Sequence, residues 1–131
     1  MSATEKRILI VDDDEAIRAL LFAILRHRGF AVDCATNGVE ALSRLRSCRY
    51  DAMLLDLMMP LKSGYDVLDD LKKVPPGARP IIFVLTAGHE TRALNPALVT
   101  SCIRKPFDVR ILLDMIMACF EPDHVAPAAA A

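Results

Sequence analysis

The stretch ILIVDDD, at residues 8–14, runs from four apolar residues directly into three aspartates. A second apolar run, at residues 53–55, ends in the same way at Asp56. Short continuous apolar runs are typical of strands in a parallel sheet, because helices cover both faces of such a sheet. Ligands bind at its carboxyl edge. Carboxylates gathered at that edge repel one another unless a hard cation lies between them, so the pattern predicts a site for an oxygen-ligated divalent metal, with Mg2+ the expected ion.

The composition limits the classes of protein to be considered. The 131 residues suffice for one domain with a substantial core. A formal net charge of −1 and the lack of any Lys/Arg block argue against binding to nucleic acid or to a membrane. We find neither a signal peptide nor a membrane-spanning stretch, and so expect a cytoplasmic protein. We expect residues 1–121 to form the domain, and residues 122–131, rich in Pro and Ala, to form a disordered tail.

A short apolar run followed by a turn and a segment of helical spacing recurs along the chain, which indicates an α/β fold. Strands are predicted at residues 7–11, 30–35, 52–55, 81–85 and about 100–104. The helices are predicted from apolar residues spaced three and four apart, which would form one buried face on each helix. These residues are Ile17, Leu20, Leu21, Ile24 and Leu25; Val39, Leu42 and Leu45; Val67, Leu68 and Leu71; and, after an N-cap at Asp108, Ile111, Leu112, Met115, Ile116 and Cys119.

The helix expected between the fourth and fifth strands is the exception. Gly88 opens this stretch and Pro96 interrupts it, so that only residues 89–95 retain helical character. We therefore expect the fourth helix to be short or irregular.

Polar residues follow four of the predicted strands, and the carboxyl ends of parallel strands meet at one edge of the sheet. They are Asp12, Asp13, Asp56, Thr86 and Lys105. Taken singly, each has an ordinary structural explanation as a helix cap, a turn former or a solvated charge. Their joint occurrence at strand ends favours a common site.

These residues lie in four segments through which the chain resembles the receiver domain of bacterial two-component response regulators. The segments are ILIVDD at 8–13, LLDLMMP at 54–60 with Gly64 after it, LTA at 85–87 and KPF at 105–107. The resemblance covers residues 6 to about 120. It implies a flavodoxin-like, doubly wound α/β fold whose five parallel strands lie in the order 2-1-3-4-5.

The resemblance also implies a role for three of the strand-end residues. Asp56 would be the phosphoacceptor, whose carboxylate attacks the phosphohistidine of a sensor histidine kinase or a histidine phosphotransfer protein. Lys105 would supply a cation to the phosphoryl group, and Thr86 a hydroxyl donor. The Lys105–Pro106 bond would be cis. Such a protein catalyses its own phosphorylation and is not a turnover enzyme.

The cofactor implied by the family is Mg2+, held by Asp12, Asp13, Asp56 and the backbone carbonyl of Met58. The metal would offset the repulsion between the Asp56 carboxylate and the incoming phosphoryl oxygens. In this family the lifetime of the acyl phosphate depends partly on the residues two positions after the phosphoacceptor and two after the threonine. Here these are Met58 and Gly88, neither of which positions a water, so we expect slow hydrolysis.

Two other classes of function use similar residues. Phosphatases of the haloacid dehalogenase type place an aspartate nucleophile and Mg2+ at such an edge, in the motif Asp-x-Asp-x-Thr. This chain has Ala16 where that motif needs threonine, and its length leaves no room for a cap domain. The second alternative is a receiver-like module that binds a partner without being phosphorylated. The presence of Asp56, Thr86 and Lys105 argues against it.

Two departures from the family pattern concern the output. Cys102 stands where receivers usually place the aromatic residue of a rotamer switch, and the interval from Thr86 to Lys105 is shorter than is common. We therefore expect a monomer or weak dimer rather than a dimer of the usual geometry. The signal would reach a downstream protein through the first helix and the site loops, or through reordering of residues 87–100. The sequence fits equally a single-domain regulator and a receiver excised from a longer protein.

Overall fold

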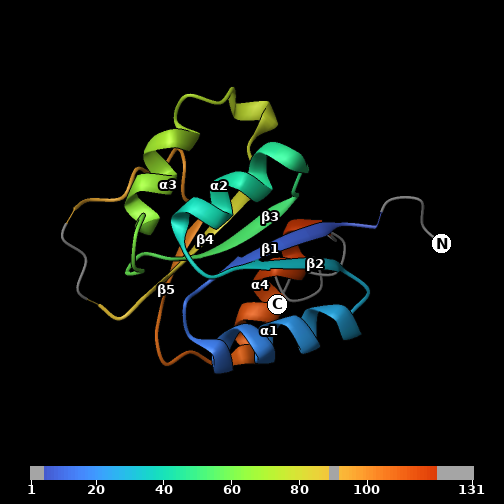
Figure 1. The fold of residues 1–131 in the computed structure, drawn as a ribbon. Coiled ribbons are helices and arrows are strands. Elements are labelled where there is room, and N and C mark those ends of the chain that lie inside the picture. Colours follow the sequence, from blue (N-terminus) through green and yellow to red (C-terminus); the bar gives the residue numbers. More distant parts are fainter. Residues whose placement is uncertain (1–4, 89–91, 121–131) are drawn as a thin grey trace.

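The computed structural model describes residues 5–88 and 92–120, which form a sheet covered by helices on both faces (Figure 1). In chain order the elements are β1 (Arg7–Val11), α1 (Glu15–His27), β2 (Ala31–Ala35), α2 (Gly38–Ser47), β3 (Ala52–Asp56), α3 (Gly64–Leu71), a 3-10 turn (Pro76–Ala78), β4 (Ile81–Thr86), β5 (Ser101–Arg104) and α4 (Val109–Phe120). All strand pairs are parallel, in the order β2-β1-β3-β4-β5. The predicted α/β fold and its strand order are confirmed.

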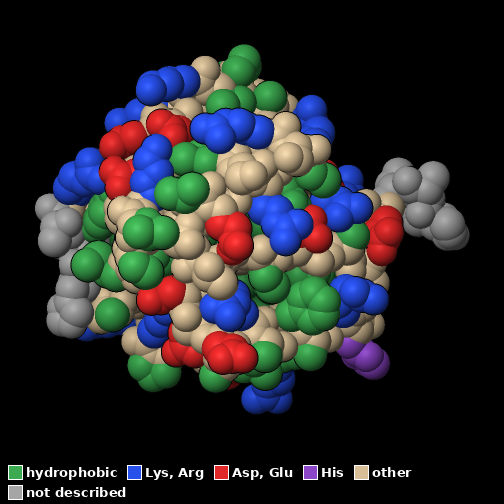
Figure 2. All heavy atoms as spheres, viewed as in Figure 1, with side chains coloured by type: hydrophobic (Ala, Val, Ile, Leu, Met, Phe, Trp, Pro, Cys, Tyr) green, Lys and Arg blue, Asp and Glu red, His purple; other side chains and the backbone are tan. Residues whose placement is uncertain are grey.

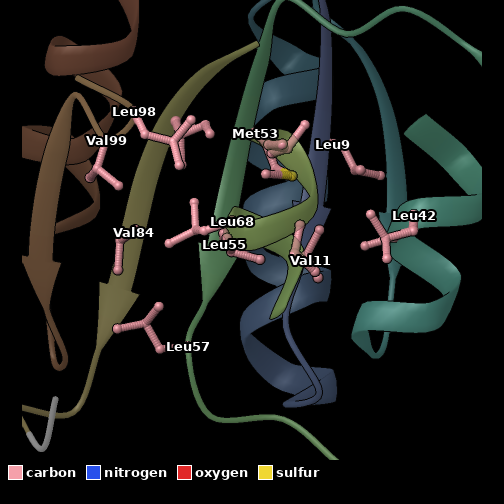
Figure 3. Close-up of a cluster of buried hydrophobic side chains, with 14 of the residues drawn as sticks. Leu9, Val11, Leu42, Met53, Leu55, Leu57, Leu68, Val84, Leu98 and Val99 are labelled. Atoms are coloured by element: carbon pink, nitrogen blue, oxygen red, sulfur yellow. The ribbon is translucent and has the colours of Figure 1, made fainter. Parts of the chain in front are cut away.

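The central strands are buried on both faces, as their continuous apolar runs predicted. Residues 8–11 of β1 and 52–55 of β3 are 0% exposed. Their side chains alternate between two cores, one beneath α2 and α3 and the other against α1 and α4. Figure 3 shows the first of these cores, to which three strands contribute Leu9, Met53 and Val84 and α3 contributes Leu68. This packing holds the carboxyl ends of β1, β3 and β4 in fixed register.

Side-chain caps determine where the helices begin. The Asp14 carboxylate accepts hydrogen bonds from the backbone N–H groups of Ala16 and Ile17, at 2.9 and 3.2 Å, and so starts α1 directly after β1. Ser63 and Asp66 form a reciprocal capping box at the start of α3. Because Asp14 is engaged as a cap, the aspartates left to form a site at this strand end are the two that precede it.

The helical spacing correctly predicted an apolar face on each helix, but some residues at the edges of these faces are exposed. Leu20 of α1, Val39 of α2 and Ile111 of α4 were predicted to be buried, but they are 47%, 55% and 60% exposed. The spacing identifies a stripe, whereas its exposed border depends on how each helix is rotated about its axis against the sheet. The residues that α4 buries are Leu112, Leu113, Ile116 and Met117.

The connection between β4 and β5 contains no helix in its described residues, 87–88 and 92–100, in agreement with the predicted irregularity. Residues 89–91 lie outside the described part, as does the tail predicted at 122–131, so the domain boundary stays a prediction. The connection packs onto the sheet through Leu98 and Val99. Arg92 joins it to α3, 3.4 Å from Asp69 and 4.5 Å above the ring of Tyr65.

Among the described helices, none combines the length and the apolar character that crossing a membrane requires. The face seen in Figure 2 carries Lys and Arg side chains interspersed with Asp and Glu, without a large field of either sign. The expectation that these residues do not attract nucleic acid remains a prediction based on this charge pattern and on the net charge of −1.

The tight contact of α3 with the end of β3 gives a test of the fold at the site. A Cβ atom at Gly64 would lie 2.4 Å from the carbonyl oxygen of Asp56 and 2.8 Å from Cα of Leu57, both in the backbone. Gly64→Ala should therefore lower the free energy of unfolding by about 2 to 4 kcal/mol, because the strand end must shift. Urea denaturation measures this.

Gly77→Ala is the matched control, because a Cβ atom there meets nothing within 4 Å. This substitution should change stability by less than about 1 kcal/mol. Equal losses for the two variants would contradict the proposed close contact at Gly64.

Candidate functional site

The ends of β1 and β3 bring three carboxylates together. Asp12 follows β1, whose last residue Val11 pairs with Leu55 of β3, and Asp56 is the last residue of β3. Asp12 is 0% exposed and Asp56 is 5% exposed, whereas Asp13 is exposed to solvent. Each offers a carboxylate oxygen, and the three oxygens lie within 4.8 Å of one another. The structure thus assembles the aspartates that the strand ends predicted.

Lys105 supplies a cation to this cluster from the end of β5. Its Nζ lies 2.8 Å from Oδ2 of Asp12 and 3.6 Å from Oδ2 of Asp56. The backbone N–H of Lys105 donates to the carbonyl oxygen of Thr86 at 2.7 Å, which ties its position to the end of β4. The Lys105–Pro106 peptide bond is cis, as predicted.

Backbone N–H groups hold the other oxygen of each buried carboxylate. The N–H of Asp14 donates to Oδ1 of Asp12 at 2.9 Å, and the N–H of Met58 donates to Oδ1 of Asp56 at 3.2 Å. The side chain of Met58 is 55% exposed. These bonds orient both carboxylates, so that their Oδ2 atoms face the Lys105 ammonium.

Arg18 also contributes to the site, although the sequence did not lead us to predict it. Arg18 of α1 donates from Nη1 to the backbone carbonyl of Asp12 at 2.9 Å. Arg18 lies one turn after the Asp14 cap, and its own N–H donates to the carbonyl of Asp14 at 3.0 Å. A cation one helical turn beyond an acidic strand end is the signal that could have indicated it. It anchors the turn that carries Asp12.

Thr86 lies beside these charges at the end of β4 and is 4% exposed. Its Oγ1 accepts a hydrogen bond from the N–H of Gly88 at 3.0 Å. The hydroxyl hydrogen therefore remains able to donate to an acceptor, which is what the predicted contact with a phosphoryl oxygen requires.

Burial and charge set the protonation of the site. Burial, together with the charge of Asp12, raises the pKa of Asp56 from 3.8 to about 6, against the opposing effect of Lys105. Burial alone would lower the pKa of Lys105, but its hydrogen bond to Asp12 and the charges of both aspartates outweigh burial and raise this pKa above 10.5. The ammonium therefore keeps its charge, whereas Asp56 lacks sufficient positive charge around it to ionise as readily as an exposed aspartate.

The donor set fits Mg2+. Carboxylate oxygens are the ligands this ion prefers, and Asp12, Asp13 and Asp56 present them within 4.8 Å of one another. When all three are ionised, they carry a formal charge of −3, of which Lys105 offsets one unit. The remaining −2 matches a divalent cation.

A sequence model of the response regulator receiver domain matches residues 8–117, which include every residue of this site. The chain belongs to the response regulator receiver family. The Haemophilus influenzae transcriptional regulatory protein CpxR homolog is 37% identical to this receiver over 114 residues. The response regulator MprA of Mycobacterium avium is 46% identical over 115 residues. Each alignment covers 86% of this receiver but only 49% and 50% of those proteins, so the chain spans about half the length of the curated relatives it matches.

Solved structures give the same result for the fold. A CheY-like receiver domain from Methanospirillum hungatei aligns with a TM-score of 0.78 at 28% identity, covering 92% of this receiver and 98% of that chain. The Thermotoga maritima response regulator TrrA, solved in complex with Mg(2+)-BeF, aligns with a TM-score of 0.74 at 36% identity, covering 86% and 96%. Receivers with near-complete coverage therefore share this architecture.

The raised pKa of Asp56 predicts how the stability of this receiver depends on pH. The folded state binds the proton more tightly than the unfolded chain, so the stabilisation is complete below about pH 4 and is lost as pH rises through about 6. Asp56→Asn keeps the neutral form at every pH. Without divalent cations it should therefore be more stable than wild type above pH 7, by about 1 to 3 kcal/mol.

Urea denaturation in EDTA at pH 4 and pH 7.5 measures this difference. Most of this advantage should disappear at pH 4, where Asp56 is protonated in the folded state. Asp114→Asn, on the exposed face of α4, serves as the control. A gain of equal size at both pH values would show that the effect does not come from ionisation of Asp56.

Proposed function

We propose that this receiver accepts a phosphoryl group from the phosphohistidine of a sensor histidine kinase or a histidine phosphotransfer protein onto Asp56. The observation that supports this most directly is the placing of the buried Asp56 carboxylate within 3.6 Å of the Lys105 ammonium and beside the carboxylates of Asp12 and Asp13. A carboxylate in this setting is both a nucleophile and part of a cation site.

In the proposed step, an oxygen of the Asp56 carboxylate attacks the phosphorus atom and forms a P–O bond. The P–N bond to the donor histidine breaks, and its electron pair stays on the imidazole nitrogen, which takes up a proton. The product is an aspartyl phosphate, and the chain ends the step covalently changed. On this proposal the receiver is not a turnover enzyme, because each phosphoryl group transferred occupies the nucleophile.

The residues proposed to hold Mg2+ are Asp12, Asp13, Asp56 and the backbone carbonyl of Met58. When bound, the ion would offset the negative charge that builds up between the carboxylate and the phosphoryl oxygens. TrrA, the relative that was solved with Mg(2+)-BeF, supports this choice of ion. The close approach of three carboxylate oxygens supports it independently.

Lys105 and Thr86 would recognise the transferred group. The Lys105 ammonium now lies closer to Asp12 than to Asp56, at 2.8 against 3.6 Å, and a phosphoryl group on Asp56 would offer it a second anionic partner. The hydroxyl of Thr86 would donate its hydrogen to a phosphoryl oxygen while still accepting from Gly88. Both interactions would favour the charged product over the free carboxylate.

We further propose that the phosphorylated receiver signals through contact with a downstream protein. Two relatives, from Haemophilus influenzae and Bacillus subtilis, are named transcriptional regulatory proteins, and their additional length is not matched by this chain. We expect this chain not to attract nucleic acid, because its formal net charge is −1 and the face seen in Figure 2 carries charges of both signs.

Incubation with acetyl phosphate tests the proposed chemistry. Here the P–O bond to the acetyl group breaks and acetate leaves. Wild type should gain one phosphoryl group by intact mass in Mg2+ and lose the adduct signal in EDTA, while Asp56→Asn should remain unmodified under both conditions. Asp114→Asn should behave as wild type. A Mg2+-independent adduct, or one retained by Asp56→Asn, would contradict the proposed site.

A folded wild type that binds Mg2+ but forms no adduct with any phosphodonor would instead favour a receiver-like module that acts without phosphorylation. Decay of the adduct after removal of the donor tests the expected slow hydrolysis, which rests on Met58 and Gly88.

A further inference from the structure

The guanidinium of Arg104 occupies the space that a side chain at position 88 would fill. Gly88 follows β4 and has a φ of +93°. A Cβ atom built there would lie 2.6 Å from Nη2 and 2.7 Å from Cζ and Nε of Arg104. Arg104 is the last residue of β5 and pairs with Thr86 across the sheet. The Arg104 guanidinium at the end of β5 thus covers the backbone of Gly88, which follows β4.

Among the described residues, 5–88 and 92–120, Arg104 finds no partner for its charge, which distinguishes it from the other cations at this edge. Lys105 pairs with Asp12, and Arg18 donates to the Asp12 carbonyl. The Arg104 side chain is exposed, and within residues 5–88 and 92–120 it makes neither a hydrogen bond nor an ion pair. Packing against Gly88 keeps this charge near the sheet edge without neutralising it.

The guanidinium is close to the reacting groups through a short series of contacts. The N–H of Gly88 donates to Oγ1 of Thr86 at 3.0 Å, and the guanidinium touches the other side of Gly88. Added to standard backbone dimensions, these contacts place Nη2 within about 8 Å of the Thr86 hydroxyl. The hydroxyl is the group proposed to contact the phosphoryl oxygens.

We propose that Arg104 is a second cationic recognition residue of this receiver, which attracts the anionic phosphoryl donor to the site mouth beside Thr86. This inference rests on the proposed function and extends it to a residue outside the metal and phosphoacceptor set. The charge of Lys105 is already offset by its ion pair with Asp12, whereas the charge of Arg104 is not paired with the buried carboxylates. The glycine at position 88 is what makes room for it.

The expected effect is moderate and electrostatic. At about 8 Å, close to the screening length in physiological salt, one positive charge changes the affinity for a dianion by about two- to fivefold. Because the guanidinium attracts the donor and does not touch the attacked atom, its loss should raise the half-saturating donor concentration and leave the maximal rate nearly unchanged. The effect should shrink as salt is added.

Phosphorylation kinetics of the full 131-residue chain with acetyl phosphate and Mg2+ test this. Arg104→Ala should raise the half-saturating concentration about two- to fivefold at low salt, and Arg104→Lys should restore most of the loss. Arg110→Ala removes an equally positive charge from α4, where the side chain is 91% exposed, and should have no such effect. Phosphoramidate, which carries less negative charge, should show a smaller difference between wild type and Arg104→Ala.

A second variant tests the packing itself. Gly88→Ala must displace the guanidinium, so it should raise the half-saturating concentration in the wild-type background more than in Arg104→Ala. An adduct on wild type with the same half-saturating concentration in Arg104→Ala would overturn this inference alone. No adduct on wild type with any donor would overturn the proposed function and this inference with it.

Discussion

The repulsion between the carboxylates of Asp12 and Asp56 is the constraint on which the rest of this site depends. Both are buried at neighbouring strand ends, where water screens their charges poorly. Lys105 offsets part of the repulsion from 2.8 and 3.6 Å. Its position depends in turn on β5 and on the backbone hydrogen bond from Lys105 to Thr86. Through its contacts with Asp12, Asp56 and Thr86, Lys105 thus links the end of β5 to the ends of β1, β3 and β4.

A proton, an ammonium and a divalent metal are alternative partners for the same negative charge. The raised pKa of Asp56, about 6, indicates that the charge of Lys105 does not fully offset the effects of burial and of Asp12. A divalent cation bound among the aspartates would stabilise the ionised form of Asp56, which is the proposed nucleophile. On the proposed function, metal binding would therefore favour the ionised, reactive form of Asp56 through electrostatics.

The fold was predictable because its information is local. The continuous apolar runs at residues 8–11 and 53–55 identified buried parallel strands, and Pro96 with Gly88 identified the irregular connection before β5. Helix rotation was not predictable, since the exposure of Ile111 depends on how α4 seats on the sheet. Individual side-chain hydrogen bonds were not identified either, even between residues close in the sequence. The bond from Arg18 to the Asp12 carbonyl needs the whole β1–α1 turn in place.

The absence of an aromatic residue at position 102 changes how a signal could leave this site. Cys102 is exposed on β5, and the connection from β4 contains no helix in its described residues. The hydroxyl of Thr86 accepts from the N–H of Gly88, so any displacement of Oγ1 toward a phosphoryl group must either stretch that bond or move the backbone of residue 88. Moving this backbone also moves the surface against which Arg104 packs. On the proposed function, a displacement of the buried hydroxyl would therefore reach the exposed face of β5 through the N–H group of Gly88 and the guanidinium of Arg104.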